Sequence, residues 1–172
     1  NDYSKFMEAD SAITYALKDL YKATDFLLNN EDIPRFNKKN IFVSGGSAGA
    51  IAALSSELPK YRVLKPSNLK DFHFSGIISA AGATFDIEQI KKTDTPIMLL
   101  HGTCDSIVSF KSKTHSCKDN SANITIYGSY EIFRARKKAN KATLLMVECN
   151  GGHEVAWISP TKRVNTVNFF IQ

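Results

Sequence analysis

The pattern of apolar and polar positions predicts helices and strands that alternate along the chain. Residues 4–29 carry apolar side chains at helical spacing, from Phe6 through Ile13 and Leu20 to Leu28. Four apolar runs predict buried strands, because they are continuous rather than alternating. These runs are 41–44, 74–82, 96–102 and 142–149.

Helical patterns separate most of these strands. Residues 48–58 are rich in alanine and stop at Pro59, and Ser129 is expected to cap a basic helix over 130–139. Ser159 and Pro160 predict the start of a last helix. A strand followed by a helix, repeated along the chain, is typical of an α/β fold. We therefore expect one domain over 1–172, with a doubly wound, mostly parallel sheet in a three-layer αβα arrangement.

The stretch IFVSGGSAGA, residues 41–50, combines the first strand with a G-x-S-x-G motif around Ser47. A strand that turns sharply into a helix needs small residues, because a Cβ would clash at the corner. Such a turn pushes the serine out with its hydroxyl exposed. The simpler interpretation of Ser47, a helix N-cap, does not require glycines on both sides.

An acid and a base follow two of the later strands. Asp105 lies in HGTCDSIV after the strand at 96–102, and His153 lies in NGGHEV after the strand at 142–149. The carboxyl ends of parallel strands meet at one edge of the sheet, so we expect Ser47, Asp105 and His153 to meet there. A serine hydroxyl needs a base, which histidine supplies near neutral pH, and an aspartate fixes the imidazole tautomer. The Ala48 N–H, at the start of the helix, is the expected oxyanion donor.

Other residues compete for these roles. Asp86 follows the strand at 74–82, and Asp94 is a weaker alternative acid. The alternative histidines are His73, His101 and His115, of which His101 is expected to pack at the end of its own strand. Trp157 is expected in the core or in a pocket wall.

Composition and motifs argue against several classes of function, namely those that need a nucleic-acid partner, a membrane span, a metal ion or a cofactor. The net charge is +5, with basic clusters such as 134–141, and no aromatic residues alternate with these charges. We interpret the clusters as solvated helix faces and expect no nucleic-acid partner. No run approaches the roughly 18 apolar residues of a membrane span. The three cysteines form no C-x-x-C pair, the four histidines are scattered, and no phosphate-binding motif is present, so we expect neither metal nor cofactor.

The motifs GGSAG, HGTCDSIV and GGHEV, in this order, resemble the α/β-hydrolase superfamily. Within it the chain is similar to bacterial carboxylesterase-type enzymes related to acetyl-xylan and feruloyl esterases. YGSYEI, before the basic helix, also resembles a segment of those esterases. The resemblance implies Ser47 as nucleophile, Asp105 as acid and His153 as base, with the Ala48 N–H in the oxyanion hole.

The resemblance also implies that strands would precede the helix at 4–29 and that a loop there would supply the second oxyanion donor. We therefore expect this sequence to be the C-terminal part of the fold, with an exposed edge at 41–44 through which copies could associate. The expected function is hydrolysis of small or carbohydrate-linked esters. A peptidase of the prolyl-oligopeptidase type and a catalytically silent fragment are the alternatives. The compartment stays open, with a secreted or periplasmic location compatible with the sequence.

Overall fold

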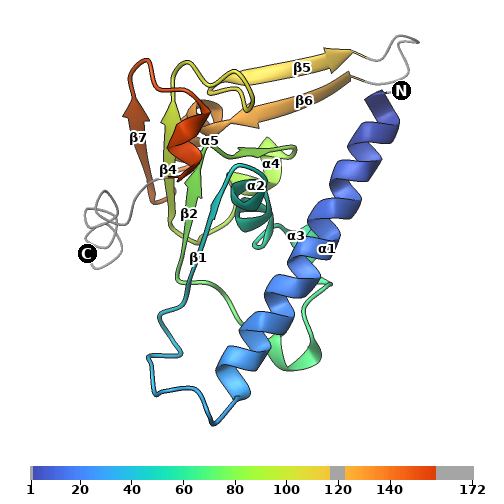
Figure 1. The fold of residues 1–172 in the computed structure, drawn as a ribbon, viewed down its shortest axis with the longest axis vertical. Coiled ribbons are helices and arrows are strands. Elements are labelled where there is room, and N and C mark those ends of the chain that lie inside the picture. The colour runs from blue at the N-terminus through green and yellow to red at the C-terminus, as the bar shows by residue number, and fades with distance from the viewer. Residues whose placement is uncertain (1, 117–122, 158–172) are drawn as a thin grey trace.

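The computed structural model describes residues 2–116 and 123–157 of the chain. Four parallel strands form its central sheet in the order β1-β2-β4-β7. Their bounds are Phe42–Gly46, Gly76–Ala80, Ile97–Gly102 and Thr143–Glu148. All four predicted strands are therefore present. Within the described residues β1 forms one edge of this sheet, as expected, and all four strands point the same way (Figure 1).

The helices also follow the predicted pattern, with two differences. The long helix α1 (Asp2–Asn29) matches its predicted position, and the helix α2 (Ala48–Ser55) begins where predicted. The prediction that α2 continues to residue 58 and is stopped by Pro59 was wrong, because α2 ends at Ser55 and Pro59 begins the short helix α3 (Pro59–Arg62). The basic helix α5 (Ser129–Lys138) has Gly128 at its N-cap, so the prediction that Ser129 caps it was wrong. The predicted helix that starts at Ser159 lies outside the described residues.

The two faces of the central sheet are covered differently in the described part of the chain. On one face, Ile77 and Leu99 pack in the main core with residues of α1, α2, α5 and the short helix α4 (Ile87–Ile90). On the other face, Met98 and Leu100 pack with Val155 of the 3₁₀ helix η2 (His153–Trp157). This alternation along β4 explains why its apolar run is continuous, since both faces of the strand are buried.

A second, antiparallel sheet was not predicted. It consists of β3 (Ala83–Thr84), β6 (Asn123–Gly128) and β5 (Ser112–Ser116), in the order β3-β6-β5. The β5 sequence SKTHS is polar and has no apolar face, so no periodicity revealed it. In Figure 1 the β5–β6 hairpin extends beyond the carboxyl ends of the central strands, at the top of the view.

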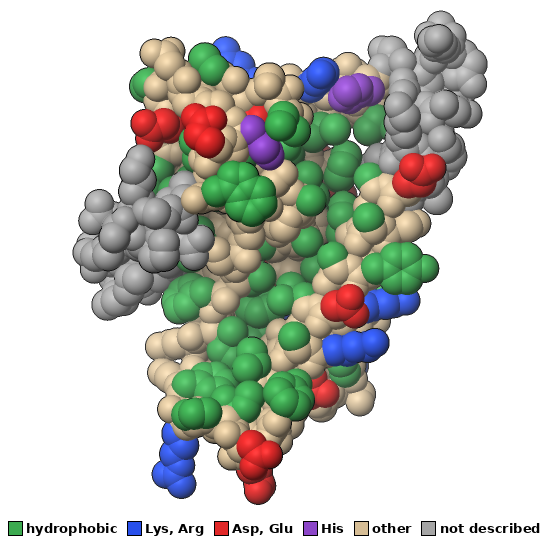
Figure 2. Space-filling view, viewed as in Figure 1, with side chains coloured by type: hydrophobic (Ala, Val, Ile, Leu, Met, Phe, Trp, Pro, Cys, Tyr) green, Lys and Arg blue, Asp and Glu red, His purple; other side chains and the backbone are tan. Residues whose placement is uncertain are grey.

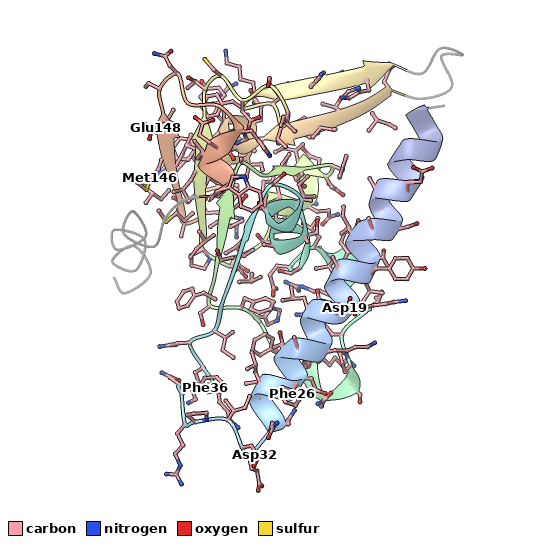
Figure 3. The ribbon with its side chains drawn as sticks, in the orientation of Figure 1. Asp19, Phe26, Asp32, Phe36, Met146 and Glu148 are labelled. Carbon is pink, nitrogen blue, oxygen red and sulfur yellow. The ribbon has the colours of Figure 1, made fainter. Side chains whose placement is uncertain are left out.

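The surface differs between the two ends of the sheet. Toward the lower end in Figure 2, apolar side chains gather on the surface, and Phe26 and Phe36 lie at this end in Figure 3. Histidine side chains lie near the upper end of the face that Figure 2 shows. Glu148, the last residue of β7, also points to that end (Figure 3). The predicted catalytic residues belong to the upper end.

Candidate active site

Ser47 occupies a tight turn between β1 and α2. Its backbone has φ 54° and ψ −123°, a conformation that residues other than glycine rarely adopt. The backbone on both sides is held, because the Ser47 N–H donates to the carbonyl of Ala80 at 2.9 Å and its carbonyl accepts from the N–H of Ala50 at 2.9 Å. The surrounding structure thus enforces a strained backbone at this serine, a feature that is common at active sites.

Two of the three glycines of the motif are required by close approach. A Cβ on Gly45 would lie 2.2 Å from the carbonyl oxygen of Gly49, and a Cβ on Gly46 would lie 2.2 Å from that of Ala156. Gly49 differs, because a Cβ there would meet no atom within 4 Å. Steric crowding at the corner therefore explains Gly45 and Gly46, but it does not explain Gly49, where the sequence argument was wrong.

The turn brings Ser47 to a histidine and an aspartate from the two later strand ends. The Oγ of Ser47 lies 2.9 Å from Nε2 of His153, and Nδ1 of the same imidazole lies 2.8 Å from Oδ2 of Asp105. The hydroxyl, imidazole and carboxylate thus form a continuous hydrogen-bonded chain. The Asp105 side chain is fully buried and that of His153 is 16% exposed, whereas Ser47 is half-buried.

Comparison of the chain with known proteins identifies its fold. No protein family model matches the chain, and no curated protein matches it. Solved structures do match. SOBER1 of Arabidopsis thaliana is 21% identical with a TM-score of 0.58, and the match covers 94% of this chain and 64% of SOBER1. The chain therefore has part of an α/β-hydrolase fold.

Two further esterase structures match this partial α/β-hydrolase fold. A truncated carbohydrate esterase from gut microbiota is 13% identical with a TM-score of 0.61, over 90% of this chain and 67% of the esterase. Esterase 2 of Thermogutta terrifontis is 14% identical with a TM-score of 0.61, over 92% of this chain and 61% of that one. The chain therefore spans about 64% of the length of SOBER1 and a similar share of these esterases.

The carboxylate of Asp105 is held by hydrogen bonds on both oxygens. Its Oδ1 accepts from the backbone N–H groups of Ile107 and Val108, each at 2.9 Å, while Oδ2 faces His153. Burial alone would raise the pKa of Asp105, but the hydrogen bonds from His153, Val108 and Ile107 outweigh it and hold the pKa below its ordinary value. Asp105 is thus ionised at neutral pH and ready to pair with an imidazolium.

The loop that carries His153 is hydrogen-bonded to the loop that carries Asp105. The carbonyl of Gly151 accepts from the N–H of Cys104 at 2.9 Å, and the N–H of Asn150 donates to Oγ1 of Thr103 at 2.9 Å. A Cβ on Gly102, the last residue of β4, would lie 2.2 Å from the carbonyl oxygen of Gly151. These contacts fix the position of His153 relative to Asp105.

The alternative acids have other partners. Asp86 is the N-cap of α4, where its Oδ1 accepts from the N–H of Gln89 at 2.9 Å. Asp94 pairs with Nζ of Lys141 at 2.5 Å on the surface, with its side chain 93% exposed. Among the described residues neither carboxylate contacts His153.

The alternative histidines also lie elsewhere. His73 lies 2.8 Å from the buried carboxylate of Glu57, and His115 belongs to the hairpin strand β5. His101 is buried at the end of β4, as expected. Trp157 is 79% exposed, so the expectation of a core position was wrong.

The start of α2 supplies backbone donors next to Ser47. Ala48 is the first residue of this helix, and the first N–H groups of a helix have no partner within it. The positive end of the helix dipole adds to their attraction for negative charge. Ala48 is exposed, so its N–H can meet a bound group beside the Ser47 hydroxyl.

Other kinds of site are not formed by the residues that the structure describes. In ranges 2–116 and 123–157 no group of three or more His, Cys, Asp or Glu side chains is placed to hold a metal ion. Across the same ranges no helix has both the length and the apolar character to cross a bilayer. Cys104 and Cys149 are exposed thiols, and Cys117 lies outside the described residues.

Proposed function

We propose that this chain carries the catalytic serine, histidine and aspartate of a serine carboxylic-ester hydrolase that works through an acyl-enzyme. The observation that carries the proposal is the hydrogen-bonded chain from Ser47 through His153 to Asp105, at 2.9 and 2.8 Å. The partial likeness to solved esterases supports it. The strained backbone of Ser47 also supports it, because such strain accompanies function more often than plain structure.

In the first half of the reaction the Ser47 oxygen attacks the carbonyl carbon of the ester. Nε2 of His153 takes the hydroxyl proton, and the buried Asp105 carboxylate stabilises the resulting imidazolium. The carbonyl oxygen becomes an oxyanion that accepts a hydrogen bond from the Ala48 N–H, and one such donor contributes about 3 kcal/mol. The carbon–oxygen bond to the alcohol then breaks, and His153 returns the proton to the departing oxygen.

In the second half a water molecule replaces the alcohol. His153 removes a proton from the water, whose oxygen attacks the carbonyl carbon of the acyl-Ser47 ester. The second tetrahedral intermediate collapses, the bond to Ser47 Oγ breaks, and His153 returns the proton to the serine. A carboxylic acid is released and the free enzyme is restored.

The proposed substrates are small esters or esters linked to a carbohydrate. The likeness to a carbohydrate esterase supports this class. A panel of acetylated sugars, short-chain nitrophenyl esters and peptide amides would separate an esterase from a peptidase.

The direct test compares the wild-type chain with Ser47→Ala. We expect hydrolysis of p-nitrophenyl acetate and covalent labelling by a fluorophosphonate, in which Ser47 Oγ displaces fluoride from phosphorus. The similar esterase 2 of Thermogutta terrifontis has been solved phosphoramylated by tabun, so a phosphorus electrophile reacts with a protein of this fold. Ser47→Ala should not be labelled, and its kcat should be about 10⁶-fold lower than that of the wild-type chain. Equal turnover by both proteins, or labelling of Ser47→Ala, would refute the assignment.

A further inference from the structure

A second histidine contacts the carboxylate that His153 uses. His101 lies near the end of β4 with its side chain fully buried. Its Nε2 lies 3.0 Å from the carbonyl oxygen of Val108 and 3.3 Å from Oδ2 of Asp105. On the other side of the ring, Nδ1 lies 2.8 Å from Oγ of Ser129, the first residue of α5.

These partners determine where the imidazole carries its hydrogen. The Val108 carbonyl and the Asp105 carboxylate only accept, so Nε2 must donate. The Ser129 hydroxyl has one hydrogen and two acceptors in reach, Nδ1 at 2.8 Å and the Gly82 carbonyl at 3.4 Å. Donation to the nearer Nδ1 satisfies the ring without a second hydrogen. Burial lowers the pKa of His101, although Val108 and Asp105 act in the opposite direction. The contacts of the two ring nitrogens thus favour the tautomer with its hydrogen on Nε2.

We propose that His101 is a positioning residue that holds the Asp105 carboxylate in the orientation His153 requires; this inference rests on the proposed function. Oδ2 of Asp105 lies between the two imidazoles, 2.8 Å from His153 and 3.3 Å from His101. The same Nε2–H also holds the Val108 carbonyl, whose residue donates its own N–H to Oδ1 of Asp105.

The ring is itself held in place. The aromatic ring of Phe110 packs against it edge to face, with centroids 5.7 Å apart at 69°. Ser129 ties Nδ1 to the start of α5. A rigid donor in a dry environment restricts the rotation of the carboxylate far more than solvent would.

The test compares His101→Leu, which removes the donor, with His101→Gln, whose side-chain amide can reach the same acceptors. With p-nitrophenyl acetate we expect His101→Leu to lose about tenfold to hundredfold in kcat with little change in KM, as is typical when an outer partner of a site residue is removed. His101→Gln should recover most of that loss. His115→Leu, the same change on hairpin strand β5, is the matched control and should keep the wild-type kcat.

Equal loss of kcat in His101→Leu and His101→Gln would overturn the proposal, as would a loss confined to KM. If His101→Leu does not fold, the comparison of His101→Gln with wild type decides, and a hundredfold loss of kcat in His101→Gln would count against the proposal.

A second measurement does not depend on activity. Nitrogen NMR of the imidazole rings near neutral pH, in the wild-type chain and in Ser47→Ala, should show His101 with its hydrogen on Nε2, as the acceptors around that nitrogen require. A hydrogen on Nδ1 under these conditions would overturn the inference. Absence of both turnover and fluorophosphonate labelling in the wild-type chain would instead refute the proposed function, and the NMR result would still decide the contact.

Discussion

Arg136 of α5 makes two hydrogen bonds to Thr93. Its Nη1 donates to Oγ1 of Thr93 at 2.7 Å and to the carbonyl oxygen of Thr93 at 3.1 Å. The guanidinium is fully buried, and burial lowers its pKa to about 10. Nη1 also donates to the carbonyl of Ile90, Nη2 donates to the carbonyls of Thr95 and Ala142, and Nε donates to the hydroxyl of Thr143. Neutral oxygens therefore compensate for the burial of a charge, and they connect α5 to the segment before β4.

We predict that Arg136→Met destabilises the fold by at least about 3 kcal/mol, because several buried oxygens lose their donor at once. Arg134→Met is the control, since Arg134 lies two residues away with its side chain 62% exposed. Arg134→Met should change the free energy of unfolding by no more than about 0.5 kcal/mol. Urea unfolding at neutral pH measures both, and equal stability of the two variants would contradict the prediction.

We predict that Asp105→Asn lowers kcat by about 10⁴, because an amide at this position favours the wrong tautomer of His153. The overall fold should persist, since the backbone N–H groups of Ile107 and Val108 can still donate to the amide oxygen. Initial rates with p-nitrophenyl acetate measure the loss. Asp86→Asn at the start of α4 is the control, and a similar loss there would argue against Asp105 as the acid.

The same carboxylate should affect the acid stability of the fold. The folded pKa of Asp105 lies below its unfolded value, so the ionised group stabilises the fold above about pH 4. That contribution is lost as the pH falls through the folded pKa. We predict that the difference in unfolding free energy between wild type and Asp105→Asn is constant near neutral pH and shrinks below about pH 4. Denaturant unfolding at a series of pH values tests this, and a difference independent of pH would contradict it.

The glycines of the turn offer a matched pair of substitutions. Gly46→Ala places a Cβ 2.2 Å from the carbonyl oxygen of Ala156, which is too close, so η2 with His153 must move. We predict a loss of kcat of about 10² for Gly46→Ala, which is typical of a displacement of about 1 Å in a catalytic group. Gly49→Ala meets no atom within 4 Å and lies inside α2, so it should keep its activity and gain up to about 1 kcal/mol in stability. Loss of activity in Gly49→Ala would show that the turn tolerates no side chain at either position.

The sequence by itself determined the alternation of helices and strands and the parallel sheet. The continuous apolar run at 96–102 identifies a strand that is buried on both faces, and the spacing in α1 identifies its apolar face. It also determined which residues follow the strand ends, and so predicted that Ser47, Asp105 and His153 would lie together. The physical reason is that strand direction and period are local properties of the chain.

Only the tertiary structure decided the rest. The β5–β6 hairpin has a polar strand without an apolar face, and it pairs with residues of a separate strand, from Ser112 with Tyr127 to Ser116 with Asn123, which its own pattern does not encode. In the folded chain Arg136 donates to six oxygen atoms, and His101 contacts the Asp105 carboxylate. A buried arginine in a basic run and a histidine in a strand look ordinary in sequence, because their partners become neighbours only when the chain is folded.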